Sequence, residues 1–213
     1  MNVLALVTQF NAEGKKDADE FRREAAAFCR WHHTYDPGAK TRIELIDNTA
    51  PRVRRRGQVL QAIDDAGKTE RIDCLAFFCH GWAAGLQLGI FTSEIRDVAP
   101  VLAARLSANA KIPLYACSTA HGGCGGNGGF ADRLRDILAP SLTGVVVDAH
   151  VTKGHCTRNP HVRRFAAPAG KGGQYLVAQM SPKWTAWKQA LRSDGAMRFR
   201  FPFMSADEIA AEL

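Results

Sequence analysis

The sequence predicts an α/β fold, a three-layer sandwich in which a mostly parallel central sheet of about six strands lies between two layers of helices. Short apolar runs alternate along the chain with longer segments of helical periodicity, which is typical of right-handed βαβ units. The run IDCLAFFC, from Ile72 to Cys79, is continuously apolar, as expected of a parallel strand covered on both faces. The 213 residues suffice for one well-buried domain of this kind.

The expected elements follow one another from the N-terminus. Strands are expected at 2–10, 42–46, 72–79, 111–116, 144–149 and 175–180. Helices are expected at 17–32, 53–66, 93–108, 130–138, 183–191 and 206–213. Asp17 and Ser93 are the expected N-terminal caps, and Gly67 is the expected stop of the second helix. Between these elements we expect a hairpin or loop at 82–92, a flexible glycine loop at 118–129 and a long loop at 150–173.

A single domain over residues 1–213 is the simplest organisation, with a core over about 1–180 and a C-terminal helical tail over 181–213. No apolar run approaches the roughly 18 to 20 residues that span a bilayer, so we expect no membrane partner. Residues 1–10 are apolar but lack a basic leader and a small-residue cleavage site, which favours a first strand over a signal peptide. We therefore expect a cytoplasmic protein.

Positive charge is concentrated in one stretch of the chain. The formal net charge is +7, and the segment from Ala149 to Ser193 contains eight basic residues and no Asp or Glu. The remaining residues are nearly balanced in charge. This asymmetry predicts an acidic partner or substrate, whereas the alternative is a solvated basic face that aids solubility. A run of arginines at 52 and 54–56 is expected to begin a solvated helix.

Six cysteines allow a disulfide interpretation, but a domain of this size without an export signal does not need cross-links. Cys29, Cys74 and Cys79 lie in apolar helix or strand patterns, so we expect them to be small buried side chains. The cysteines that lie in or beside loops are the candidates for chemistry: Cys117, Cys124 and Cys156.

Two of the most apolar strands end in reactive side chains. One is followed by His80 and Gly81, and the next by Cys117. Ligands of open α/β sheets bind outside the carboxyl ends of the strands, and consecutive strands are often neighbours. A nearby imidazole can take the proton of a thiol or stabilise its thiolate, and a backbone N–H freed at a glycine can bind an oxyanion, which is worth roughly 3 kcal/mol in a transition state. A His or Cys at a strand end is, taken alone, more often structural.

These residues resemble a known family. LAFFCHGW, from Leu75 to Trp82, looks like the strand and His-Gly motif of the caspase-like fold, which includes caspases, metacaspases, gingipain and clostripain relatives and separase-like CHAT proteases. IPLYACSTAHGGCGGNGGFADRL, from Ile112 to Leu134, looks like the strand, nucleophilic cysteine, glycine loop and helix that follow, in the style of the CHAT group. The element order supports the resemblance from residue 2 to about 180, and the sharp motifs cover about 35 residues.

The resemblance implies His80 as general base or acid and Cys117 as nucleophile, with the backbone N–H groups of Gly81 and Cys117 as the oxyanion hole. It implies no third catalytic side chain, no metal and no cofactor. Two features depart from the pattern. Tyr115 stands two residues before the nucleophile, where caspases have Gln and metacaspases Asp, and the 37 residues from His80 to Cys117 are fewer than the roughly 50 of caspases. The chain is therefore not expected to be a close caspase or metacaspase, and the motif does not give the P1 residue, which precedes the cleaved bond.

Further residues are candidates for binding a substrate. Asp148 ends the fifth expected strand, where it would bind a basic group, hold His80 or cap a loop. In the resembling fold the loop at 150–173 borders the specificity pocket, and arginines there would favour acidic substrate side chains. The candidates are Tyr115, Asp148, Lys153, Arg158, Arg163 and Arg164.

Metal and nucleotide sites are the rival interpretations of the same segments. Zinc ligands usually come in tight pairs, and the closest spacing is His121-x₂-Cys124 without a clean second pair. The donors considered are Cys117, His121, Cys124, His150, His155, Cys156 and His161. The sequence GGCGGNGG lacks the GK[ST] ending of a P-loop and does not fit G-x-G-x-x-G. We therefore expect no metal and no nucleotide site.

Two functions of different classes follow from the sequence. The first is a cysteine endopeptidase that uses a His80–Cys117 dyad through a thioester acyl-enzyme, with a peptide or protein substrate that carries acidic groups. The second is a catalytically inactive caspase-like module that binds an acidic partner through the basic surface of residues 149–193. Nucleic acid is the less favoured partner, because no recognised motif and no interleaved aromatic platform occur there. The oligomeric state does not follow from the sequence.

Overall fold

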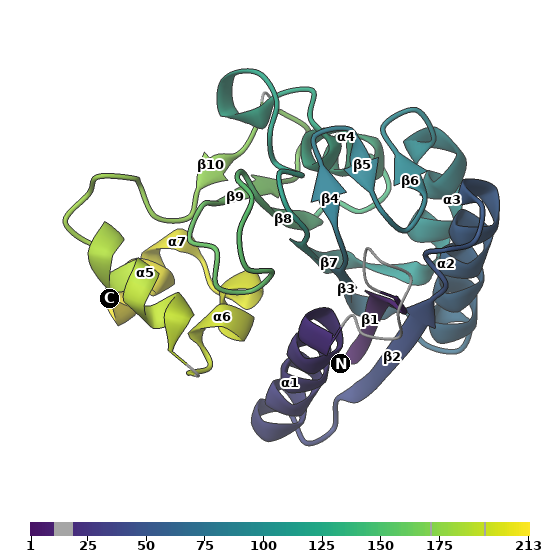
Figure 1. Cartoon of the computed structure of the whole chain (residues 1–213), viewed down its shortest axis with the longest axis horizontal. Coiled ribbons are helices and arrows are strands. Elements are labelled where there is room, and N and C mark those ends of the chain that lie inside the picture. The colour runs from purple at the N-terminus through teal and green to yellow at the C-terminus, as the bar shows by residue number, and fades with distance from the viewer. Residues whose placement is uncertain (11–18, 171, 194) are drawn as a thin grey trace.

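A seven-stranded sheet runs through the molecule in the order β10-β9-β8-β7-β3-β1-β2 (Figure 1). The computed structural model describes residues 1–10, 19–170, 172–193 and 195–213. The strands of this sheet are β1 (Asn2–Thr8), β2 (Lys40–Ile46), β3 (Ile72–Phe78), β7 (Leu106–Tyr115), β8 (Val146–His150), β9 (Val162–Ala166) and β10 (Gln174–Tyr175). The five strands β2, β1, β3, β7 and β8 are parallel, β9 pairs antiparallel with β8, and β10 pairs antiparallel with β9. The mostly parallel α/β fold predicted from the sequence is confirmed.

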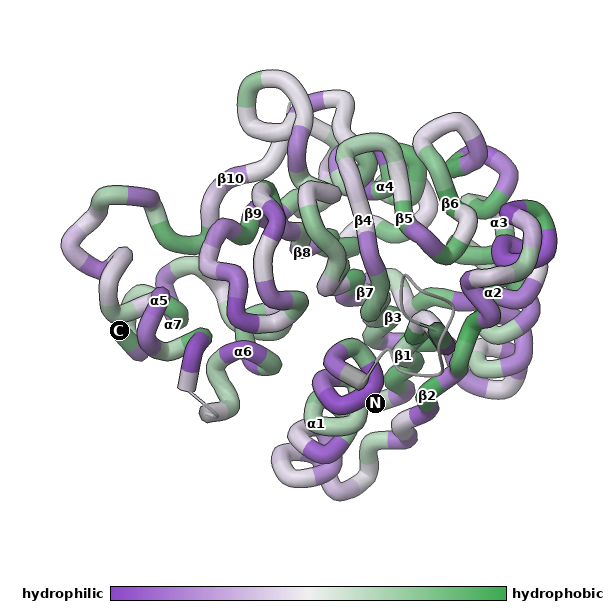
Figure 2. The backbone as a smooth tube through the Cα atoms, viewed as in Figure 1, coloured by the Kyte–Doolittle hydropathy of each residue, from purple (hydrophilic) through white to green (hydrophobic). Residues whose placement is uncertain are grey.

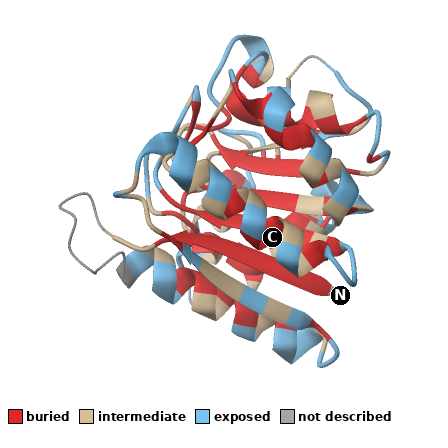
Figure 3. Ribbon diagram, turned by 90° about the vertical axis from the view of Figure 1, so that its right-hand side faces the viewer, coloured by how far each residue is buried: buried red, intermediate tan, exposed pale blue. Residues whose placement is uncertain are grey.

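Helices cover both faces of the sheet and complete a three-layer sandwich. The helices are α1 (Asp19–Tyr35), α2 (Arg52–Gly67), α3 (Ile95–Arg105), α4 (Phe130–Leu138), α5 (Trp184–Arg192), α6 (Met197–Arg200) and α7 (Ala206–Glu212), with short 3-10 helices η1 (Cys124–Gly126) and η2 (Phe201–Phe203). One hydrophobic cluster gathers apolar residues of α2, α3 and α4, and a second gathers those of α1, α5, α6 and α7. Buried residues fill the central strands, while the edge strand β2 and the outer helix surfaces are more exposed (Figure 3).

Strand β1 shows how one apolar run serves both layers. All seven of its residues are buried. Leu4 and Leu6 belong to the cluster under α2 and α3, whereas Val3, Ala5 and Val7 belong to the cluster under α1. Successive side chains of a strand point to opposite faces, so a central parallel strand must be apolar at every position. The apolar residues accordingly follow the central strands in Figure 2.

A small antiparallel sheet follows β3, where the sequence predicted a hairpin or loop. Its strands are β4 (Gly81–Trp82), β5 (Gly85–Leu86) and β6 (Ile90–Phe91). Gly89 lies between β5 and β6 with φ +88°, and a Cβ there would lie 2.6 Å from the carbonyl oxygen of Arg52. This close approach fixes the small sheet against the start of α2.

Several expected boundaries are wrong. The third expected helix ends at Arg105 instead of residue 108, and β7 begins at Leu106, five residues early. Glu94, not Ser93, precedes that helix, and it makes no side-chain capping hydrogen bond. The expected cap Asp17 lies outside the described residues.

The expected strand at 175–180 and the expected long loop at 150–173 are also corrected. Strand β10 ends at Tyr175, and Met180 has φ +61°, a left-handed conformation that no strand residue adopts. The loop contains β9, which the sequence did not indicate because two adjacent arginines occupy its centre. The additional strand β9 makes the sheet seven-stranded instead of six-stranded.

Among the described residues, no helix combines the length and the apolar character needed to cross a bilayer.

The buried histidine His32 makes the stability of the fold depend on pH. Its ring is 1% exposed, packs against Phe28, Trp31 and Phe203, and has no hydrogen-bond partner for either nitrogen. Burial lowers the pKa of His32 from 6.5 to about 4. Between these values the unfolded chain binds the proton that the folded chain rejects, so stability falls as the pH drops below 6.5.

We predict that His32→Leu reduces this loss of stability in acid. At pH 5 the unfavourable charging of one such histidine costs about 2 kcal/mol relative to neutral pH. The free energy of unfolding is measured with urea at pH 7 and at pH 5. The decrease between the two pH values should be smaller in the variant than in the wild type by about this amount. The control is His33→Leu, because His33 is exposed and should leave the wild-type dependence in place. An equal pH dependence in all three proteins would contradict the assignment.

Candidate functional site

The pairing of β3 with β7 places His80 and Cys117 just beyond the ends of two neighbouring strands. The two strands are parallel neighbours, and Phe78 is paired with Tyr115. His80 lies two residues after Phe78, and Cys117 lies two residues after Tyr115. They therefore leave the sheet at the same level of its carboxyl edge, which is where ligands of open α/β sheets bind.

His80 lies on the surface of the molecule between α1 and the small sheet. Its ring meets the edge of Phe21 from the first turns of α1, with centroids 5.1 Å apart and planes at 89°. Its carbonyl oxygen accepts a hydrogen bond from Gln87 N at 2.9 Å. The backbone of His80 is thus fixed by the small sheet, while its imidazole stays exposed and is oriented by an aromatic neighbour.

Cys117 is half-buried at a sharp turn after β7. Its Sγ donates to the carbonyl oxygen of Gly154 over 3.5 Å. Ser118 follows with φ +56°, a left-handed conformation that is uncommon outside glycine. The backbone N–H of Ser118 donates to Thr152 O at 3.3 Å. The thiol therefore stands at the tip of a constrained turn, against the loop that follows β8.

Gly81 is the point where the two strand ends touch. A Cβ built on it would lie 2.8 Å from Ala116 Cβ, 2.8 Å from Thr119 Cγ2 and 3.0 Å from Cys117 O. No side chain fits at that distance without a shift of its neighbours. Glycine at this position therefore allows the His80 and Cys117 segments to approach each other.

Four cysteines are chemically distinct from Cys117 because they are buried: Cys29, Cys74, Cys79 and Cys156. Burial raises the pKa of Cys29 to about 11 and that of Cys79 to about 12, and it raises the pKa of Cys156 still further. A higher pKa means less of the reactive thiolate at neutral pH. All six cysteines are free thiols, and Cys117 and Cys124 are the accessible ones. Burial of Cys29, Cys74 and Cys79 is as predicted, whereas the expectation that Cys156 is available for chemistry is wrong.

Tyr115 does not contact a substrate from its position in the structure. Its side chain is fully buried, stacks on Phe78 with ring centroids 4.5 Å apart, and donates its hydroxyl to Arg198 O at 3.2 Å. Tyr115 therefore points into the layer beneath α1, α5 and α6. The prediction that it binds substrate is corrected to a packing role, because alternate residues of β7 face opposite layers.

Asp148 and Arg164 are likewise used inside the fold. They form a two-pronged ion pair between β8 and β9, with Arg164 Nε and Nη2 each 2.8 Å from an Asp148 oxygen. Arg164 also donates to the carbonyl oxygens of Phe201 and Met204. Asp148 is 2% exposed. Both residues join the C-terminal segment to the sheet, which corrects the expectation that they bind substrate.

The other predicted basic residues lie in three different places. Lys153 is exposed beside Gly154, next to the thiol of Cys117. Arg158 lines a cavity against α1. Arg163 lies over the ring of Tyr175 at 4.5 Å and beneath the glycine loop. Of the predicted set, Lys153 is the residue next in the chain to Gly154, whose carbonyl oxygen accepts from Cys117 Sγ.

The glycine loop at 118–129 is anchored at several points. Gly173 N donates to Gly125 O at 2.7 Å, and Gly128 N donates to the buried carboxylate of Asp132 at 2.8 Å. Gly126 has φ +78°, and a Cβ there would lie 2.4 Å from Ala120 O. The loop therefore needs glycine for its own close packing.

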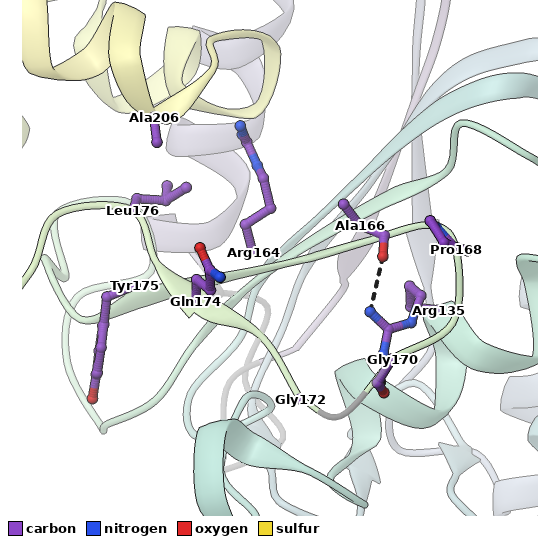
Figure 4. Close-up of a pocket in the computed structure, with 10 residues that line it drawn as sticks. All are labelled: Arg135, Arg164, Ala166, Pro168, Gly170, Gly172, Gln174, Tyr175, Leu176 and Ala206. Atoms are coloured by element: carbon purple, nitrogen blue, oxygen red, sulfur yellow. Dashed lines mark hydrogen bonds between the residues drawn. The ribbon is translucent and has the colours of Figure 1, made fainter.

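A cavity of about 350 Å³ lies beside this loop, between β9, β10 and α7 (Figure 4). Arg135 reaches it from α4, but its guanidinium already donates to Asp132, Asp136 and the carbonyl oxygens of Ala166 and Gly170. Figure 4 shows the bond to Ala166. Arg135 therefore closes the wall of the cavity and offers little to a ligand.

The only group of potential metal ligands in the described part of the chain combines Glu20, His155 and Cys156, whose donor atoms lie within 4.8 Å of one another. The Nδ1 atom of His155 accepts hydrogen bonds from the backbone N–H groups of Thr157 and Arg158. A metal-bound histidine normally donates its second N–H, so this pattern is opposite to that of a metal ligand. Glu20 was missed in the sequence because it lies 135 residues before His155.

Phe21 and Gly154, which contact the His80–Cys117 pair, were missed for the same reason. Phe21 fits the apolar face of a helix, and Gly154 is one residue in a long loop. No local pattern distinguishes them, because both contacts arise only when the chain folds.

Neither a family model nor a curated protein sequence matches the chain. Among solved structures it is similar to prephenate dehydrogenase from A. aeolicus in complex with hydroxyphenyl propionate and NAD+, at 14% identity and a TM-score of 0.37. The match covers 90% of this chain and 57% of that one. A likeness at this level carries no argument about the site.

We predict that Cys117 is alkylated faster than Cys124, although Cys124 is more exposed. An imidazole beside a thiol raises the fraction of thiolate at neutral pH. The measurement is iodoacetamide labelling followed by peptide mass spectrometry, in the wild type and in His80→Ala. The His80→Ala substitution should lower the alkylation rate of Cys117 and leave the alkylation rate of Cys124 unchanged. Equal rates for the two cysteines, or no effect of His80→Ala, would show that the pair is not coupled.

We also predict that Gly81→Ala disturbs the turn that carries Cys117. The added methyl group overlaps Ala116 and Thr119, and such overpacking costs about 1–3 kcal/mol of unfolding free energy. The rate of Cys117 alkylation should change as well. The matched control is Gly57→Ala in α2, where a Cβ meets nothing within 4 Å and alanine favours the helix. A Gly81→Ala protein as stable and as reactive as the wild type would refute the close contact.

Proposed function

We propose that the protein is a cysteine endopeptidase in which His80 and Cys117 form the catalytic dyad. The observation that supports this most is the β3–β7 register, in which Phe78 pairs with Tyr115 and both reactive side chains follow two residues later. The imidazole is exposed and the thiol is half-buried, so both groups are accessible at the carboxyl edge of the sheet. The resemblance of both strand ends to the caspase-like fold supports the same assignment.

In the proposed reaction, His80 takes the proton of the Cys117 thiol, and Sγ attacks the carbonyl carbon of a peptide bond. The carbonyl oxygen becomes an oxyanion, which backbone N–H groups at Gly81 and Cys117 would stabilise. Collapse of this intermediate breaks the C–N bond, and His80 gives its proton to the leaving amine. Water, deprotonated by His80, then attacks the thioester, releases the acid product and restores the thiol.

The surroundings of the thiol support this chemistry. Ser118 in its left-handed conformation turns the chain away directly after Cys117, which leaves Sγ at the tip of the turn. Its hydrogen bond to Gly154 O is a contact that a thiolate, which has no proton to donate, would give up. The pair lies on strand ends of a rigid sheet, and sites on strands hold their geometry better than sites on mobile loops.

The test is cleavage of a fluorogenic peptide library varied at P1, with the wild type and Cys117→Ala compared. We expect cleavage by the wild type and its loss in the variant, because removing the nucleophile removes the acyl-enzyme route. Cys124→Ala is the matched control, since it removes the other accessible thiol and should keep full activity. Activity that persists in Cys117→Ala refutes the assignment. Absence of cleavage, together with salt-dependent binding of acidic polymers, would favour the inactive binding module instead.

A further inference from the structure

A groove of about 480 Å³ runs along α1 on the side that faces the loop after β8. One wall is the helix face that carries Glu20, Arg23, Glu24, Ala27 and Arg30. The opposite wall is formed by His155, Arg158 and Arg198. We call this feature the α1 groove. The eleven residues from 20 to 30 span about 15 Å of helix, which matches four or five residues of an extended peptide.

Both walls of the α1 groove contain a sequence neighbour of a residue that contacts the proposed dyad. Glu20 precedes Phe21, whose ring contacts His80 at 5.1 Å. His155 follows Gly154, whose carbonyl oxygen accepts from the thiol of Cys117. Each wall of the groove thus includes a residue that is next in the chain to one that contacts a partner of the dyad. A peptide held there would lie beside the position where its bond is cleaved.

Positive charge exceeds negative charge in the α1 groove. Four arginines line it against two glutamates. Glu24 is already engaged, because it accepts a hydrogen bond from Thr157 and lies 3.5 Å from Arg198. Arg30 is exposed, and no hydrogen bond or ion pair within the described ranges involves its side chain. A guanidinium at the end of a groove is suited to a carboxylate, which it can bind through two parallel hydrogen bonds.

We propose that the α1 groove binds acidic side chains of the peptide substrate, with Arg30 as the residue that determines this specificity. This inference rests on the proposed peptidase function and adds a substrate class to it. Selectivity for acidic peptides thus comes from α1 rather than from the arginines of β9, which are bound within the fold.

The test measures binding and cleavage separately. The binding probe is a short fluorescein-labelled peptide that contains three glutamates among glycines and serines. The control peptide has glutamine at the same three positions. Fluorescence anisotropy with full-length Cys117→Ala should show binding of the glutamate peptide about fivefold tighter at low salt, as expected for one partly exposed ion pair. Added salt should reduce this difference.

Arg30→Gln in the same background should remove the discrimination between the two peptides. Arg22→Gln is the matched control, because Arg22 is exposed on the same helix but does not line the groove. Equal binding of both peptides by Cys117→Ala overturns the inference. An effect of Arg22→Gln as large as that of Arg30→Gln also overturns it, because attraction would then depend on overall charge.

Cleavage of the same two peptides by the wild type separates this inference from the proposed function. Selective binding without cleavage would retain the α1 groove as an acidic-peptide site and reject the peptidase. Cleavage without selectivity would retain the peptidase and reject the role of the α1 groove.

Discussion

The register between β3 and β7 is the constraint on which the candidate site depends. β3 and the last four residues of β7 are buried, so a slip by one residue would move their side chains to the opposite layer. Val3 to Val7 of β1 is paired with Cys74 to Phe78 of β3, which fixes β3 from its other side. His80 and Cys117 inherit their proximity from this packing. The geometry of two exposed polar residues is thus determined by the apolar residues that precede them.

The part of the site that lies on these strands could be predicted from sequence, because its signal is local. A continuous apolar run identifies a buried strand, and the residue after it marks the carboxyl edge. Strand β9 could not be predicted, since Arg163 and Arg164 at its centre suggest a loop. Their partners, Tyr175, Asp148 and the carbonyl oxygens of Phe201 and Met204, come from distant segments. Tyr115 was misassigned because a motif position says nothing about which face of the strand it occupies.

The segment 181–213, expected from the sequence to be a helical tail, forms part of the hydrophobic core. Trp187 and Phe201 are buried in the same cluster as Phe28 of α1. Tyr115 donates to Arg198 O, and Arg164 donates to two carbonyl oxygens of this segment. Buried polar groups are stable only when they are paired, so these bonds fix the segment in one position. The residue Arg198, which it contributes to the α1 groove, is held by the same contacts.

A run of charged residues in a sequence therefore does not show which charges are accessible to a ligand in the folded protein. The arginines of β9 are prominent in the basic stretch from residue 149 to 193, yet Arg164 is neutralised by Asp148 and Arg163 lies against an aromatic ring. Arg30 belongs to a helix of mixed charge, α1, for which the sequence indicated no binding role. Its side chain has no hydrogen bond or ion pair in the described part of the chain, and it lines the α1 groove. What decides the electrostatics of a site is the charge left over after folding, and that quantity depends on which residues become neighbours.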